Sequence, residues 1–329
     1  MGLRRHDRRG RGPSTSVESR LIILQHPSNG GKPVVSILSS VFNESVHLKE
    51  MIDSVIAQDL TEWELLLVDD ASTDDTVDII RRASDADPRV RLVSTGVKLG
   101  KVAAFNLAFS QSRGDLIVLM GGDDTMPPDS LSGRAAAIPE SKRSIKVAGY
   151  FKLLSMSDSP RFDKMLLPRG TAGSRSGPSI TMTRPLAEMC FPVPEELPSE
   201  DTWLGELTHL LADEVVNSPH VVVNYRIHAA NSNPRHKDFG TMSESMHRRA
   251  KAIDLILENP AFDLSPASRA HLRSHVAVEE LRYRGKTFKL LSQRGMPLVD
   301  RLANASMSSP ALFSVRTRFY RYFSGWRGR

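Results

Sequence analysis

The sequence predicts an α/β fold in which a mainly parallel β-sheet carries helices on both faces, followed by a helical C-terminal region. Apolar runs alternate with helix-period segments from Val34 to Phe151, at intervals of about 25 to 30 residues, as in strand–helix–strand crossover units. After Asp238 the pattern is helical to the end of the chain. Of the 329 residues, 40% are hydrophobic and 25% are charged, which is ordinary for a globular protein. No run approaches the ~18 apolar residues that a membrane span requires.

The first half of the chain contains four expected strands with helices between them. The strands are apolar runs at residues 34–38, 64–68, 90–93 and 116–120. The first helix has an apolar face at i, i+3 and i+4 spacing, formed by Leu48, Met51, Ile52, Val55 and Ile56. Ser72 or Thr73 is expected to cap the second helix. The third helix carries Val102, Phe105 and Phe109.

The second half is less regular. Residues 155–180 are rich in Ser, Gly, Pro and basic residues, and are expected to form a long loop that is either a lid over a ligand or disordered. A helix is expected to open near Leu197, and a strand is expected at Val221–Tyr225. The pattern divides the chain into a basic, disordered tail (1–31), an α/β domain (32–238, with halves 32–135 and 136–238) and a helical region (239–329).

The distribution of charge and the single cysteine indicate which partners and which compartment to expect. The net charge is +6, but the basic residues gather at the two ends, and residues 315–329 combine arginines and aromatic residues with no acid. Such a segment predicts a peripheral membrane contact or a solvated terminal helix, whereas the acid-rich first half argues against nucleic acid. A single cysteine, Cys190, excludes an internal disulfide and favours a reducing, cytoplasmic compartment.

Two acid pairs follow expected strands. Asp69 and Asp70 end the second strand, and Asp123 and Asp124 follow the fourth, directly after Gly121 and Gly122. Since the carboxyl ends of parallel strands form one ligand-binding edge, the pairs are expected to converge. One or two carboxylates with a diphosphate make an ordinary magnesium or manganese site, although aspartates are also common in turns.

Common nucleotide and hydrolase motifs are missing from the chain. No G-x-G-x-x-G follows the first strand, no Walker A motif appears, and no G-x-S-x-G motif is present. A phospho-receiver domain would carry its acid pair after the first strand, whereas here the pair follows the second.

Several ordered motifs instead agree with one family. VVSILSSVFNES, ELLLVDDASTDDT, LGKVAAFNLAF and DLIVLMGGDD follow one another within residues 33–135, and PSED (198–201) and YRIH (225–228) come later. Together they resemble the family 2 glycosyltransferases of the GT-A fold. The resemblance implies a nucleotide-binding half (32–135), an acceptor half (136–238), a nucleotide-sugar donor and a Mn²⁺ or Mg²⁺ cofactor.

The resemblance assigns one group of residues to the nucleotide. Ser40, Phe42 and Glu44 match the first nucleotide-contacting loop, in which the aromatic ring packs on the base. Asp70 matches the residue that binds the base, and Lys101 lies in the Gly-Lys segment near the nucleotide. The usual tyrosine of this loop is phenylalanine here.

A second group is assigned to the metal and the chemistry. Asp123 is expected to meet the ribose or the metal, Asp124 to ligate the ion, and His228 to reach the metal or the diphosphate. Asp201 matches the catalytic base. The first aspartate of the family motif is Gly122 here.

These residues predict an inverting, metal-dependent glycosyltransferase that moves a single sugar to an acceptor hydroxyl. The acceptor is expected to be a glycan or a lipid-linked sugar, in polysaccharide or glycolipid assembly for the cell envelope. Single-sugar transfer is expected because the Q-x-x-R-W motif and membrane spans of processive relatives are missing. The alternative is a non-catalytic nucleotide-sugar-binding or scaffold protein that keeps the fold. A nucleotidyltransferase would need a Gly-rich basic loop after the first strand, and residues 39–44 offer none.

Overall fold

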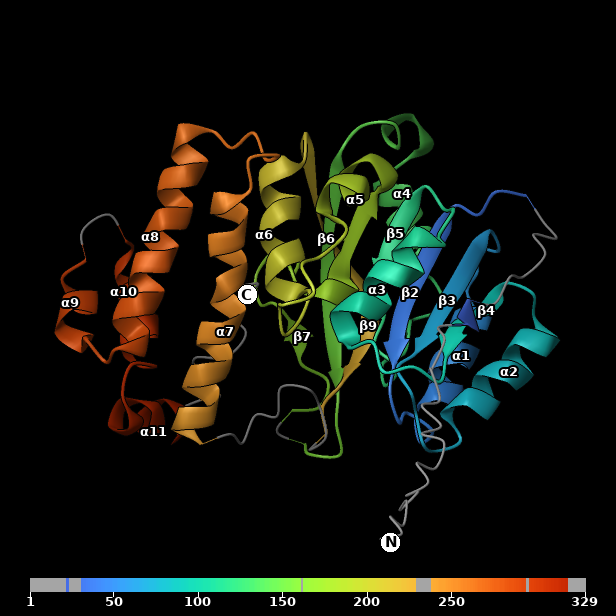
Figure 1. Cartoon of the computed structure of the whole chain (residues 1–329), viewed down its shortest axis with the longest axis horizontal. Coiled ribbons are helices and arrows are strands. Elements are labelled where there is room, and N and C mark those ends of the chain that lie inside the picture. Colours follow the sequence, from blue (N-terminus) through green and yellow to red (C-terminus); the bar gives the residue numbers. More distant parts are fainter. Residues whose placement is uncertain (1–21, 24–30, 161, 229–237, 294–295, 319–329) are drawn as a thin grey trace, which may run out of the picture.

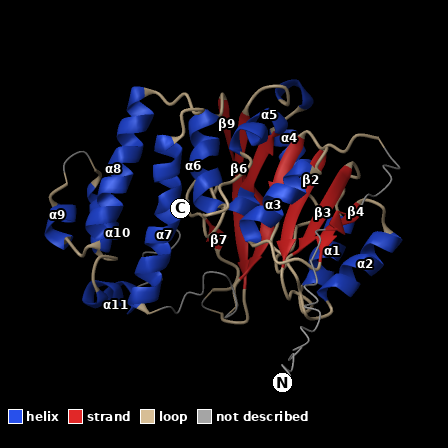
Figure 2. Cartoon of the chain, in the orientation of Figure 1, coloured by secondary structure: helices blue, strands red, loops and turns tan. Residues whose placement is uncertain are grey.

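The computed structural model describes residues 22–23, 31–160, 162–228, 238–293 and 296–318 (Figure 1). Within these residues nine strands form one mixed sheet, and helices cover both of its faces (Figure 2). The α/β fold with a mainly parallel central sheet is therefore confirmed. The predicted basic tail (1–31) lies almost entirely outside the described residues. None of the described helices is both long and apolar enough to cross a bilayer.

The four strands expected in the first half form the parallel centre of the sheet. They are β2 (Val35–Val41), β3 (Trp63–Asp69), β4 (Val90–Thr95) and β5 (Leu116–Leu119). Their spatial order is β4-β3-β2-β5, with all three pairings parallel. The chain thus moves outward from β2 to β4 and then returns to the other side of β2. Connections on the two sides of β2 lie on opposite faces, so a crevice opens at the carboxyl ends of β2 and its neighbours.

The remaining strands extend the sheet on both sides. They are β1 (Ile22–Ile23), β6 (Val147–Met156), β7 (Leu166–Leu167), β8 (Ile180–Thr183) and β9 (Glu214–Arg226). β8 pairs antiparallel with both β5 and β6, while β9 runs parallel to β6. The strand expected at Val221–Tyr225 is longer than predicted because its ladder with β6 begins at Glu214.

The helices divide between the two faces. In chain order they are α1 (Leu48–Ile56), α2 (Thr76–Ala86), α3 (Lys101–Ser110), α4 (Ser130–Ala137), α5 (Arg184–Cys190), α6 (Asp201–Leu211), α7 (Phe239–Glu258), α8 (Pro266–Tyr283), α9 (Thr287–Leu291), α10 (Leu298–Ala305) and α11 (Pro310–Arg318). Along β3, Leu65 and Leu67 face the core beneath α1, α2 and α4, whereas Leu66 and Val68 face the core beneath α3, α5 and α6. Successive side chains of a strand point to opposite faces, so the apolar run 65–68 of β3 is buried on both sides.

The helical region continues the second of these cores. Ile253 and Ile256 of α7 and Leu272 of α8 belong to the same buried cluster as Trp203 and Leu204 of α6. Figure 1 shows α7 lying beside α6, with α8 beyond it. Shared apolar burial therefore fixes α7 against the α/β domain, which matters for the site described below.

Two local expectations differ from the structure. The N-cap of the second helix is Asp75 and not Ser72 or Thr73. Those two residues bond to the neighbouring segment instead: Ser72 Oγ accepts from the backbone N–H of Asn43 (2.8 Å), and Thr73 N–H donates to Asn43 Oδ1 (2.8 Å). The expected loop at residues 155–180 contains β7 and a 3-10 turn at Gly177–Ser179.

Part of that loop is held by a buried lysine. Lys152 Nζ donates to the carbonyls of Pro168, Gly170 and Ala172 at 2.8, 2.7 and 2.6 Å. Its side chain is buried in β6. A charged ammonium that satisfies three carbonyls gives this segment a fixed path that its composition did not predict.

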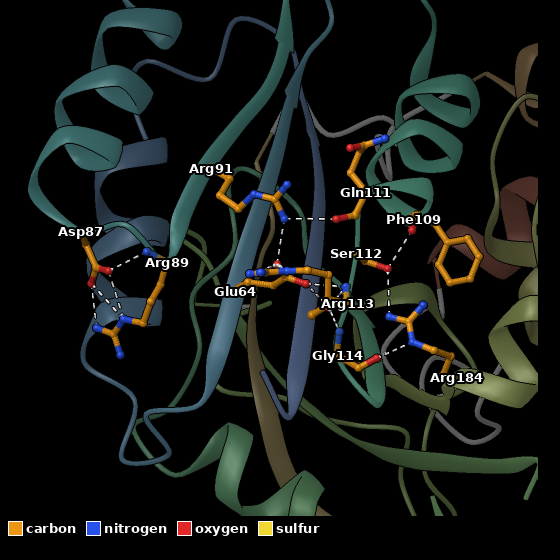
Figure 3. A network of polar contacts seen from close by, with 11 residues as sticks. Glu64, Asp87, Arg89, Arg91, Phe109, Gln111, Ser112, Arg113, Gly114 and Arg184 are labelled. Atoms are coloured by element: carbon orange, nitrogen blue, oxygen red, sulfur yellow. Dashed lines mark hydrogen bonds and ion pairs between the residues drawn. The ribbon is translucent and has the colours of Figure 1, made fainter. Parts of the chain in front are cut away.

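A buried network of ion pairs and hydrogen bonds links the amino ends of the central strands (Figure 3). Glu64 of β3, which is 1% exposed, accepts from Ser36 Oγ (2.7 Å), Arg91 Nη1 (2.8 Å) and the backbone N–H of Arg113 (2.6 Å). Gly114 N–H donates to the same serine hydroxyl (2.7 Å). This network ties the α3–β5 connection to β2 and β3 at the end of the sheet opposite the crevice.

Candidate active site

A cavity of about 1000 Å³ lies at the carboxyl ends of the central strands. All nine residues predicted from the sequence line it: Ser40, Phe42, Glu44, Asp70, Lys101, Asp123, Asp124, Asp201 and His228. They come from β2 and the segment after it, from the segments after β3, β5 and β9, and from the first residues of α3 and α6. The sheet topology thus brings together residues separated by up to 188 positions in the sequence.

The segments after β2 and β3 form one rigid corner of the cavity. Asn43 and Ala71, which flank the predicted nucleotide contacts, have φ angles of 55° and 63°, a left-handed backbone conformation that non-glycine residues seldom adopt. Hydrogen bonds between the two segments maintain it: Asn43 contacts Ser72 and Thr73, and Glu44 N–H donates to Thr76 Oγ1 (2.8 Å). Local strain that the surrounding contacts maintain in this way is typical of functional sites.

Asp70 organises the adjoining wall. Its Oδ1 accepts from the backbone N–H groups of Leu99 (2.6 Å) and Gly100 (2.8 Å), and its Oδ2 pairs with Lys98 (2.9 Å). Lys98 Nζ also lies 3.2 Å from the centroid of the Phe42 ring, which is 46% exposed. The sequence interpretation missed Lys98, although the KLGK segment contains it three residues before Lys101.

The second acid pair lies across the cavity. Asp124 is 1% exposed, and its Oδ1 accepts from the backbone N–H of Arg226 (2.8 Å). His228 Nε2 lies 2.9 Å from Asp123 Oδ2. A Cβ placed on Gly121 would meet Asp123 Oδ1 at 2.8 Å and Asp124 Oδ2 at 3.0 Å. The two carboxylates therefore turn back over the same glycine, and a side chain at this position would have to displace them.

Electrostatics show an excess of negative charge at this edge. Burial and the charge of Asp123 raise the pKa of Asp124 well above its usual range. Burial, followed by the charge of Asp123, raises the pKa of Glu44 to about 7. Both carboxyl groups therefore resist ionisation until a cation approaches.

These acids fit a divalent ion that completes its shell with ligand oxygens. No group of three or more potential ligand side chains is arranged to hold a metal by itself in the part of the chain that the structure describes. Hard divalent ions commonly bind one or two carboxylates together with substrate phosphates, and the converging oxygens of Asp123 and Asp124 match that pattern.

Comparison with known proteins identifies the domain that builds this cavity. The sequence model "Glycosyl transferase family 2" matches residues 36–173. The chain carries a glycosyl transferase family 2 domain. An uncharacterized glycosyltransferase of Haemophilus influenzae is 36% identical over 99 residues, which are 30% of this chain and 40% of that protein. The chain spans 40 to 53% of the length of the first curated relatives that it matches.

Two solved structures share the fold of the glycosyltransferase domain and its helical region. S. aureus TarS, in complex with UDP-GlcNAc, aligns with a TM-score of 0.58 at 19% identity, covering 89% of each chain. The mannosyltransferase PcManGT of Pyrobaculum calidifontis, in complex with GDP-Man and Mn²⁺, aligns with a TM-score of 0.58 at 17% identity, covering 94% of this chain and 87% of that one.

The predicted base lies in a second group of charges in the cavity. Asp201 is the first residue of α6, and its Oδ1 accepts from the backbone N–H of Gly177 (3.3 Å). The neighbouring Glu200 is 2% exposed and pairs with Lys101 Nζ at 2.9 Å. Lys101, predicted to lie near the nucleotide, thus lines the cavity and neutralises the residue beside the predicted base.

The pKa shifts in this group follow from burial and pairing. Burial raises the pKa of Glu200, and Lys101 partly offsets the shift. Burial by itself would lower the pKa of Lys101, but the charges of Glu200 and Asp201 outweigh it and raise that pKa. Among described residues, Glu200 Oε2 has no hydrogen-bond partner.

The cavity has a further wall that sequence patterns did not indicate. It consists of α7 residues Thr241, Glu244, Ser245, Arg248 and Arg249. This helix lies outside the matched residues 36–173, and its cavity-facing stripe is defined only by its packing against α6.

Proposed function

We propose that the protein is a metal-dependent, inverting glycosyltransferase that moves a single sugar from a nucleotide-sugar to an acceptor hydroxyl. The observation that carries the proposal is the convergence of all nine motif residues on one cavity of about 1000 Å³. That volume is at the upper end of the range typical of small-molecule sites, so it can admit a donor and part of an acceptor.

The donor base and ribose would lie on the wall formed by Phe42, Lys98 and Asp70. The exposed Phe42 ring offers a stacking surface, and Lys98 lies against the same ring. Asp70 is held in place by two backbone N–H groups, so its orientation is set before a ligand arrives. Such preorganisation reduces the cost of binding.

Asp124 would ligate Mn²⁺ or Mg²⁺, with Asp123 and His228 beside it. A cation bound there would neutralise the charge on the departing diphosphate. Arg226 contributes to the same place: its Nε donates to the carbonyl of Asp123 (2.8 Å), and its Nη2 lies 2.5 Å from Glu50 Oε2. Through these two bonds Arg226 fixes the backbone at Asp123, the first residue of the acid pair.

Asp201 would act as the catalytic base. Its carboxylate takes the proton of the acceptor hydroxyl while the acceptor oxygen forms a bond to the anomeric carbon. The bond from that carbon to the diphosphate breaks, and the nucleoside diphosphate leaves with the electron pair. In-line attack inverts the anomeric centre.

The acceptor would be a glycan or a lipid-linked sugar, in polysaccharide or glycolipid assembly at the cytoplasmic face of a membrane. We propose that the basic aromatic segment at residues 315–329 makes peripheral contact with anionic lipid; beyond residue 318 this segment lies outside the described residues.

A thermal-shift panel of nucleoside diphosphates and nucleotide-sugars, with and without Mn²⁺, tests the proposal. Selective stabilisation that depends on Mn²⁺, followed by release of the nucleoside diphosphate on turnover, is expected. Binding without turnover would instead support a non-catalytic nucleotide-sugar-binding protein, and no response to any nucleotide would refute the proposal.

A further inference from the structure

The α7 wall of the cavity carries two arginines that the proposed reaction does not use. Residues 241, 244, 245, 248 and 249 follow helical spacing and form one stripe that faces the cavity. Arg248 is exposed and Arg249 is half-buried. Neither guanidinium forms a hydrogen bond or an ion pair with any described residue, whereas arginines elsewhere near the site, such as Arg226, are fully engaged.

The acid on the same stripe forms no ion pair with either arginine. Glu244 accepts a hydrogen bond from the Tyr283 hydroxyl (2.6 Å), which belongs to α8. The next basic residue along α7, Lys251, pairs with Glu196 at 3.3 Å and does not line the cavity. Two guanidinium groups that pair with no described residue therefore line the cavity from this helix.

Arg249 also marks the junction with a second cavity. A groove of about 460 Å³ runs between α7, α8 and α10, and Arg249 lines both spaces. Thr202, the residue directly after the proposed base, lines the groove too. The groove therefore adjoins the cavity at Arg249, and His271 and Asn304 also line it.

The position of Arg249 assigns it to the acceptor end of the cavity. It lies close enough to Lys101 for its charge to act on that residue, and Lys101 pairs with Glu200 beside the proposed base. The acceptor hydroxyl must reach this base, whereas the donor diphosphate is proposed to lie at the acid pair after β5. A guanidinium binds phosphate or carboxylate through paired N–H donors.

We propose that Arg248 and Arg249 form an anion subsite for the acceptor, which carries a phosphate or carboxylate group close to the hydroxyl that receives the sugar. The inference rests on the proposed function and adds the chemical class of acceptor. The groove past Arg249 takes the next units of the acceptor chain, so the substrate is an anionic oligomer or a sugar linked through phosphate.

Calorimetric titration with matched anionic and neutral probes tests the subsite. The pairs are glycerol 3-phosphate with glycerol, and glucuronate with glucose, each measured with and without Mn²⁺ and the nucleoside diphosphate that stabilises the protein. In the unmodified chain the anionic member of each pair is expected to bind about tenfold more tightly, because each charged hydrogen bond contributes a factor of this order. This preference is expected to shrink at high ionic strength.

Three single variants separate the possible roles. Arg249→Gln and Arg248→Gln should remove most of the anion preference, while Lys251→Gln, which removes a positive charge from the same helix outside the cavity, should preserve it. All three should bind the nucleoside diphosphate with unchanged affinity. Neither guanidinium forms a hydrogen bond or an ion pair with a described residue, so both variants are expected to fold.

Two results would overturn the subsite. Equal binding of anionic and neutral probes to the unmodified chain would show that no acceptor anion is recognised. A selective loss of nucleoside diphosphate affinity in Arg249→Gln would show that the arginines serve the donor. If no nucleotide binds to any variant, the proposed glycosyltransferase function fails separately, and the probe titrations without nucleotide still decide the subsite.

Discussion

Replacing Lys101 with methionine isolates the electrostatic role of the Lys101–Glu200 pair. The charges lie 2.9 Å apart, which corresponds to an attraction of about 6 kcal/mol at an effective dielectric constant near 20. The lysine side chain is 40% exposed, so hydration screens much of this attraction. We expect Lys101→Met to lower the free energy of unfolding by about 2 to 3 kcal/mol at pH 8, below the ~3 to 5 kcal/mol for fully buried pairs.

The raised pKa of Glu200 determines whether the free energy of unfolding rises or falls with pH. Burial already raises the folded-state pKa of Glu200, so stability is greatest when the carboxyl group is protonated and falls as pH rises through the folded pKa. Without Lys101 that pKa rises further, and the variant should lose more stability between pH 5 and pH 8 than the unmodified chain.

Urea unfolding at several pH values measures the effect, and Glu200→Gln provides the matched control. In the Lys101→Met/Glu200→Gln double variant no buried charge remains unpaired, so most of the lost stability should return. A loss below about 0.5 kcal/mol that does not change with pH would refute the reasoning, because surface pairs behave in that way.

Three further predictions concern the reaction and the tail. Asp201→Asn should lower turnover by about 10²- to 10⁴-fold while nucleoside diphosphate affinity stays the same, and unchanged turnover in a product-release assay would exclude the base assignment. Asp124→Asn should abolish the gain in nucleoside diphosphate affinity on adding Mn²⁺, measured by calorimetry with chelator-treated protein as the reference. An equal Mn²⁺ effect in both proteins would contradict the metal role. Removing residues 319–329 should reduce co-flotation with vesicles that contain phosphatidylserine, whereas neutral vesicles should show no difference; equal flotation would rule out the tail contact.

The sequence was most informative where local pattern and topology agree. Four apolar runs predicted the parallel centre of the sheet, because strands buried on both faces leave continuous apolar segments. Once those strands were ordered, the rule that ligands bind at their carboxyl ends placed Asp70 and Asp124 at one edge. Both now line the same cavity, although their roles stay predictions.

The parts that sequence patterns missed depend on tertiary packing. Lys98 becomes relevant only because Asp70 fixes the backbone that follows it, at Leu99 and Gly100. From the sequence alone, Arg248 and Arg249 would be predicted to be solvated charges on an amphipathic helix, which is the usual state of such residues. Only the packing of α7 against α6 turns them toward the cavity, and no short-range pattern encodes that contact.

The structure also accounts for the glycine in the first position of the acid motif. A Cβ on Gly122 would lie 3.0 Å from both Glu44 Cγ and Val41 Cγ1, so an aspartate there would have to displace one of them. Overpacking of this kind typically costs about 1 to 3 kcal/mol. Glu44 occupies the space beside this position, and burial and the charge of Asp123 raise the pKa of its carboxyl group. The edge therefore keeps a third acid, supplied by the segment after β2, and Gly122 is the residue that leaves room for it.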